Sequence, residues 1–86
     1  MKIKDLILVI KEKINRNIIV ENIEIEDKTF LHKSHVGHDK NKFHLKLIIK
    51  SYELKKMKKI QSTRKIYSIL KEELEKYIHS LQILII

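Results

Sequence analysis

Residues 64–85 read RKIYSILKEELEKYIHSLQILI, and the spacing of their apolar side chains changes once along the stretch. Up to Tyr77 the apolar residues recur every three or four positions, which predicts an amphipathic helix over about 60–76. From 78 to 85 they alternate with polar residues, which predicts a strand. A single histidine, His79, lies where the predicted helix gives way to the strand.

The rest of the chain supplies one more long helix and two more strands. A helical stripe predicts a helix that fades near 15–17, and it consists of Ile3, Leu6, Ile7, Ile10 and Ile14. Alternation predicts strands from residue 23 and over 43–51, while Leu54 and Met57 suggest a short helical turn in the connector 52–59. We therefore expect a single α+β domain over 1–86, ordered α-β-β-α-α-β, with helices on one face of a three-stranded sheet.

The composition of the chain limits which kinds of functional site it can form. The 86 residues include no cysteine, which excludes disulfides, thiol catalysis and a self-contained thiolate cluster. No apolar run approaches the roughly twenty residues of a membrane span, and the run 6–10 is too short for a signal peptide. We expect a cytoplasmic protein with no membrane association. The net charge of +8 admits a nucleic acid or an acidic partner, although the lysine-rich and isoleucine-rich composition expected of an AT-rich genome accounts for it more simply.

Histidine is the remaining metal ligand of note. Four of the five histidines fall within residues 32–44, namely His32, His35, His38 and His44. We expect the fold to bring His79 towards this region. Any soft-metal site must use histidine or borrow thiolates from a partner, so these histidines are a candidate metal half-site. From the residues alone a hydrogen-bonded structural role is favoured for His79, and His44, within a strand, is also expected to be structural. No nucleophile elbow, phosphate loop or pair of catalytic carboxylates is found, so we do not expect an enzyme.

Several motifs together resemble the BolA family over about residues 2–85. They are DKT at 27–29, HVGH at 35–38, HLKLIIKS at 44–51, RKIYSILKEEL at 64–74 and IHSL at 78–81. Two positions depart from the family pattern. Its phenylalanine-x-glycine is Leu54-Lys55-Lys56 here, and only Arg64 remains of its RHR triplet.

The resemblance implies a fold similar to a type II KH domain and an adaptor function. BolA-like proteins pair with monothiol glutaredoxins around a shared [2Fe-2S] cluster, in iron-sulfur cluster trafficking or iron regulation. Carried over, the ligands are His79 and a histidine between the first two strands. Counting from Asp27 selects His32, which we prefer, whereas matching the H-x-G-H element selects His35. The resemblance further implies a monomer without a cofactor when the protein is alone.

The alternative function is that of a DNA-binding transcriptional regulator. A basic run surrounds the start of the second long helix and consists of Lys55, Lys56, Lys58, Lys59, Arg64 and Lys65. Lysines at a helix N-terminus suit phosphate groups. The same run is also consistent with a solvated face or a surface that docks a glutaredoxin. A GxxG nucleic-acid clamp is excluded because Gly37 is the only glycine.

Overall fold

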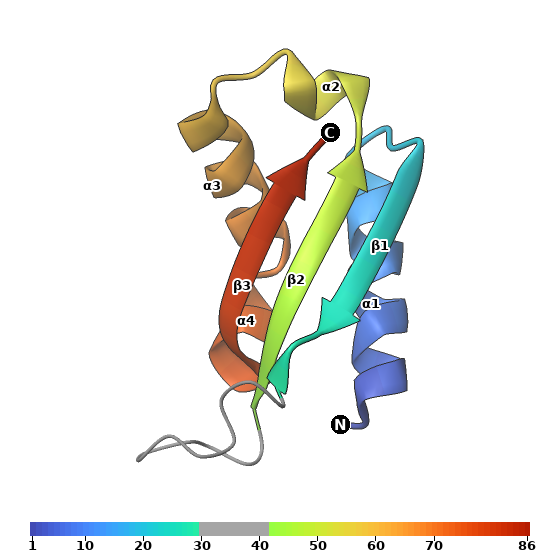
Figure 1. Cartoon of the computed structure of the whole chain (residues 1–86), viewed down its shortest axis with the longest axis vertical. Helices are drawn as coiled ribbons and strands as arrows, with labels where there is room; N and C mark the ends of the chain where they lie inside the picture. The colour runs from blue at the N-terminus through green and yellow to red at the C-terminus, as the bar shows by residue number, and fades with distance from the viewer. Residues whose placement is uncertain (30–41) are drawn as a thin grey trace.

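A three-stranded mixed sheet forms the centre of the molecule (Figure 1). The computed structural model describes residues 1–29 and 42–86. Within them the elements are α1 (Ile3–Asn17), β1 (Asn22–Asp27), β2 (Phe43–Lys50), α2 (Tyr52–Lys55), α3 (Lys59–Ile69), α4 (Lys71–Lys76) and β3 (Ile78–Ile85). β2 lies in the middle, antiparallel to β1 and parallel to β3. The parallel pair requires a crossover, which α2, α3 and α4 provide.

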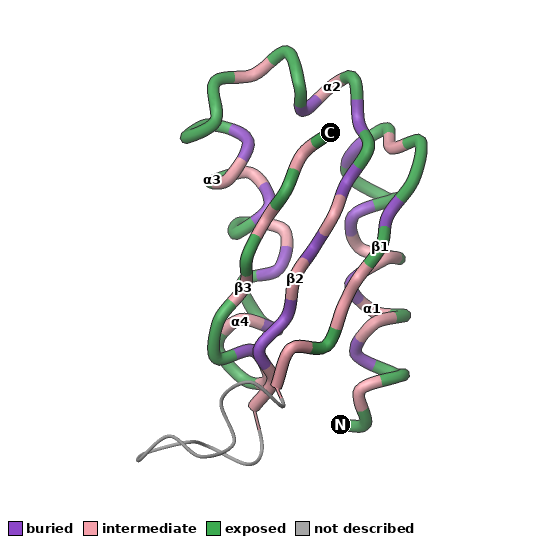
Figure 2. The backbone as a smooth tube through the Cα atoms, viewed as in Figure 1, coloured by how far each residue is buried: buried purple, intermediate pink, exposed green. Residues whose placement is uncertain are grey.

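The helices cover one face of this sheet, which confirms the predicted α+β architecture (Figures 1 and 2). On β2 the side chains of Leu45, Leu47 and Ile49 are buried, because alternate residues of a strand face the same side. Leu6 and Ile10 of α1 are buried in the same core. Its other buried members are Ile14, Ile18, Ile23, Leu54, Ile66, Leu70 and Ile78. The opposite, open face of the sheet carries the intervening residues.

The prediction of one helix over 60–76 is wrong, because the helix is interrupted at Leu70. This residue has φ −100° and ψ 18°, outside the helical region, and it separates α3 from α4. Its amide still donates to Ile66 O, and its carbonyl still accepts from Leu74 N. The spacing of the apolar residues therefore continues across the break, and no proline or glycine marks it in the sequence.

The connector after β2 contains the expected helical turn, α2. Ser51 caps it: the side-chain oxygen accepts from Leu54 N at 3.2 Å, and the hydroxyl donates to Ile19 O at 2.8 Å. Ser51 is fully buried, and its bond to Leu54 N is buried with it, whereas the bond to Ile19 O is partly buried. The cap thus joins the start of α2 to the segment that follows α1. In the described part of the chain no helix has the length and apolar character needed to cross a membrane.

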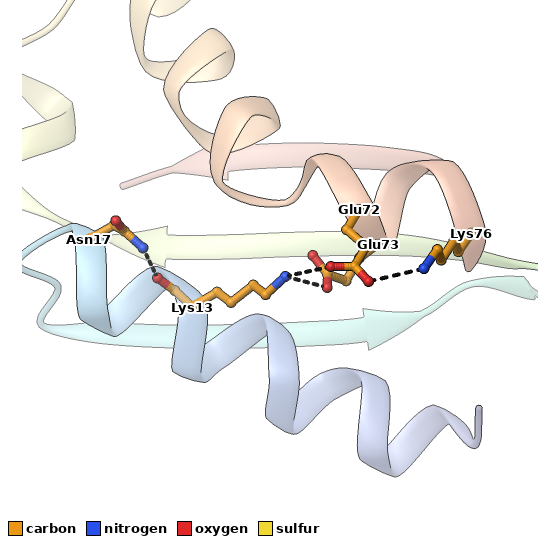
Figure 3. Close-up of polar contacts among 5 residues, drawn as sticks. All are labelled: Lys13, Asn17, Glu72, Glu73 and Lys76. Atoms are coloured by element: carbon orange, nitrogen blue, oxygen red, sulfur yellow. Dashed lines mark hydrogen bonds and ion pairs between the residues drawn. The ribbon is translucent and has the colours of Figure 1, made fainter.

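An ion pair connects α1 to α4 just before β3 (Figure 3). Lys13 Nζ lies 2.6 Å from Glu73 Oε2 and 3.7 Å from Glu72 Oε2. Glu73 is buried, whereas Glu72 is exposed and also pairs with Lys76. The pair fixes the helix that leads directly into Ile78 and His79.

Candidate functional site

The first residues of β3 form a bulge. Phe43 pairs with Ile78 and His44 pairs with Ser80, so His79 has no partner in the register. Phe43 N donates to Tyr77 O at 2.8 Å, which anchors the two strands on the N-terminal side of the irregularity. A bulge of this kind turns a side chain away from the face that regular alternation would give it. We refer to residues 78–80 opposite Phe43 and His44 as the β3 bulge.

The bulge places His79 on the open face of the sheet. In regular alternation His79 would share the helix-covered face with Leu81, Ile83 and Ile85. Instead Ile78 is buried, His79 and Ser80 are both exposed, and both contact the same side chain, that of His44. The ring of His79 therefore does not lie in the hydrophobic interior.

His44 holds the two residues together. Its Nδ1 lies 2.6 Å from Ser80 Oγ, and its Nε2 lies 3.1 Å from His79 Nδ1. The two imidazole rings meet edge to face, with centroids 4.7 Å apart and planes inclined by 61°. His44 is only 6% exposed, although its neighbours Phe43 and Leu45 occupy the other face of β2. The burial and hydrogen bonds of His44 agree with the structural role predicted for it, and its ring also contacts that of His79.

Backbone bonds bring the end of β1 to the same place. Lys28 N donates to His44 O at 2.7 Å, and His44 N donates to Thr29 Oγ1 at 3.1 Å. Asp27 Oδ1 accepts hydrogen bonds from both the amide and the hydroxyl of Thr29, an Asx turn that closes the strand. Asp27 is the last residue of β1. Thr29 is the last described residue before residue 42. Through its contact with His44 it lies beside the pair formed by His44 and His79.

The two predicted partners of His79 cannot be placed. His32 and His35 both lie outside the described residues, so their roles stay predictions, and so does ligation by His79 itself. Within 1–29 and 42–86 no group of three or more histidine, aspartate or glutamate side chains could hold a metal ion.

The chemistry available at His79 follows from its hydrogen bonding. A neutral imidazole carries one N–H and one lone pair. Nδ1 is engaged with His44, while no hydrogen bond reaches Nε2 from any described residue. If Nδ1 carries the proton, the exposed Nε2 presents a lone pair. An imidazole held in this manner is typical of protein metal ligands.

The basic run lies at the other end of the sheet, near α2 and the last residues of β3 (Figure 1). Lys55, Lys58, Lys59 and Arg64 are exposed. Two members are already engaged: Lys65 Nζ lies 3.0 Å from Glu53 Oε2, and Lys56 Nζ lies 4.3 Å from the centre of the Tyr52 ring. The two candidate sites are therefore separate surfaces.

The chain is similar in sequence and in fold to several known proteins. Residues 14–86 match the family described as BolA-like protein. The chain is 34% identical over 73 residues to the DNA-binding transcriptional regulator BolA of Haemophilus influenzae. The aligned region covers 85% of this chain and 68% of that protein. Among solved structures, the BolA domain of SufE1 from Arabidopsis thaliana has a TM-score of 0.76 and 27% identity, over 99% of this chain and 92% of that one. BolA1 from the same plant has a TM-score of 0.73 and 26% identity, over 88% and 83%.

Proposed function

Because this chain belongs to the BolA-like protein family, we propose that it is an adaptor that binds a monothiol glutaredoxin and shares a [2Fe-2S] cluster with it. His79 supplies one ligand from this chain and His32 the second, with His35 as the alternative. The thiolates come from the partner, since this chain has none. Such an adaptor acts in iron-sulfur cluster trafficking or iron regulation.

The observation that carries the proposal is the environment of His79. The side chain is exposed, one ring nitrogen is held by His44, and the other has no hydrogen bond within the described residues. A merely structural histidine would be expected to be buried with both nitrogens bonded. The donor set also fits the group: histidine replaces cysteine on one iron of some [2Fe-2S] centres, where it raises the reduction potential.

Mixing experiments test this proposal. The purified chain and a monothiol glutaredoxin are combined with iron, sulfide and glutathione, then examined by native mass spectrometry and visible absorption. We expect a heterodimer whose mass includes one cluster. His79→Ala should change the spectrum and shorten the cluster lifetime, whereas Gln82→Ala, an exposed change on the same strand, should do neither.

The second ligand is identified in the same assay. His32→Ala and His35→Ala are compared, and the variant that alters the spectrum names the ligand. A spectrum and lifetime identical to wild type for His79→Ala would exclude His79 as a ligand.

A second candidate function is DNA binding through the basic run. Two observations favour it: the Haemophilus influenzae relative is named a DNA-binding transcriptional regulator, and Lys55, Lys58 and Lys59 are exposed together around the start of α3. Titration of a labelled duplex at two salt concentrations tests it. Binding that depends on sequence and persists near physiological salt supports regulation, whereas binding that ignores sequence and disappears there reflects charge attraction alone.

A further inference from the structure

We propose that His44 is a positioning residue that fixes the tautomer and ring orientation of His79, through a hydrogen-bonded series Ser80–His44–His79 built by the β3 bulge. The inference rests on the proposed function, in which Nε2 of His79 is the metal-ligating atom. It assigns a role to His44 and Ser80 that neither the sequence motifs nor the adaptor function supplies.

The orientation of His44 is fixed from both sides of its ring. One nitrogen contacts Ser80 Oγ at 2.6 Å and the other contacts His79 Nδ1 at 3.1 Å. Turning the ring over would break both contacts, and 94% of the residue's surface is shielded from solvent. His79, in contrast, is exposed and has this one ring contact within the described chain. A rigid buried imidazole therefore orients a more exposed one.

The direction of the hydrogen bonds follows from the requirement that Nε2 of His79 keeps its lone pair. Nδ1 of His79 must then carry the proton and donate to His44 Nε2. His44 is left with its own proton on Nδ1, which donates to Ser80 Oγ. Both rings stay neutral with one proton each, so the arrangement places no net charge at the buried His44. A hydroxyl suits the far end because it can accept this bond while donating elsewhere.

The bulge is what makes the series possible. Successive residues of a regular strand point to opposite faces, so His79 and Ser80 could not both contact one side chain. With His79 unpaired in the register, both reach His44 from the same strand. Removing a side chain that hydrogen-bonds to a metal-ligating histidine commonly lowers metal affinity or activity by about 10–100-fold.

Two substitutions of His44 separate positioning from a structural role. In His44→Gln the side-chain amide of the glutamine lies near the original position of Nε2 and can still accept a hydrogen bond from His79. In His44→Asn the shorter side chain places its amide near the original position of Nδ1, where it reaches only Ser80. We expect the cluster shared with the glutaredoxin to be lost about 10–100-fold faster with His44→Asn than with wild type. His44→Gln should recover most of the lifetime. A role confined to Ser80 and folding predicts the reverse order.

A second measurement needs no glutaredoxin. Long-range ¹⁵N–¹H correlation spectra of the isolated chain report the tautomer of His79, recorded at a pH about two units above that at which free histidine side chains titrate. We expect the proton on Nδ1 in wild type and in His44→Gln, and on Nε2 for most molecules of His44→Asn. If His44→Asn does not fold, Ser80→Ala replaces it and should shift the tautomer in the same direction.

These readouts distinguish the failure of the inference from that of the proposed function. If wild type assembles no cluster, the proposed function fails, and the tautomer spectra still decide whether His44 directs His79. A proton on Nε2 of His79 in wild type, or equal cluster lifetimes for the Gln and Asn variants, overturns the positioning role.

Discussion

Lys13 Nζ lies 2.6 Å from Glu73 Oε2 and thereby joins the first helix to the one that precedes His79. The carboxylate side chain is 5% exposed and the lysine side chain 32% exposed. The second carboxylate oxygen, Oε1, has no hydrogen-bond partner in the described part of the chain. The hydrogen bond to Glu73 is the main cause that raises the pKa of Lys13 above 10.5. Any stability linked to this shift is therefore complete below that pH and is lost as the pH rises through the raised value.

Replacing Lys13 by methionine should destabilise the fold, because it leaves the buried Glu73 carboxylate without its cation. Removing one partner of a buried pair costs about 3–5 kcal/mol, and the partial exposure of Lys13 reduces this to about 1–3 kcal/mol. Urea unfolding at pH 7 measures the loss. The control is Glu72→Gln, which alters an exposed carboxylate 3.7 Å from the same lysine and should have little effect.

The double variant Lys13→Met with Glu73→Leu should regain most of the stability, since it removes both charges and the unbonded oxygen together. We expect its free energy of unfolding to lie within about 1 kcal/mol of wild type. A double variant as unstable as the sum of its single changes would show that the two side chains act independently.

Substituting Ser51 by alanine should cost about 1–2 kcal/mol of stability. The change removes the α2 cap at Leu54 N and leaves Ile19 O without the hydroxyl that now donates to it. Thermal unfolding of Ser51→Ala is compared with that of Ser68→Ala, an exposed serine on α3. Equal melting temperatures for the two variants would contradict the capping role.

Acid should weaken the contact between α2 and α3. The hydrogen bond from Lys65, and then that from Ile19 N, hold the pKa of Glu53 below the usual 4.5. A carboxyl whose pKa is lower in the folded state stabilises the fold above its unfolded pKa, and this contribution is lost as the pH falls through the folded value. Glu53→Gln should therefore lower Tm slightly at pH 7, and its effect on Tm should shrink as the pH falls through the pKa of Glu53 in the folded state. Glu24→Gln, which removes a carboxylate without an ion pair among the described residues, should show no such pH dependence.

The two ends of the sheet should be separable in function. We expect weaker duplex binding from the triple variant Lys55→Gln, Lys58→Gln, Lys59→Gln. The slope of the logarithm of the binding constant against the logarithm of the salt concentration should become shallower by about one for each lysine that contacts a phosphate. Cluster assembly with the glutaredoxin should remain at the wild-type level. His79→Ala should impair cluster assembly and leave duplex binding unchanged. Loss of both properties in either variant would indicate one shared surface.

Much of the fold could be predicted from local spacing. The stripe Leu6, Ile10 and Ile14 and the alternation of β2 and β3 each depend on neighbours along the chain, and the structure confirms the helix and strands they predicted. The break at Leu70 could not be predicted, because the flanking hydrogen bonds and the apolar spacing continue through it. The buried pairing of Glu73 could not be predicted either, since the nearby glutamates Glu72 and Glu75 are the same residue type and are exposed.

Composition and periodicity are properties of the chain alone, so the order of the elements, the lack of thiolates and the place of His79 at the start of the last strand could be predicted without the fold. The contacts of His79 could not, because they depend on how the strands pair. A one-residue bulge against β2 moves its ring from the helix-covered face to the open face, next to His44. Strand register depends on pairing between segments 35 residues apart, and no local pattern encodes the position of the unpaired residue.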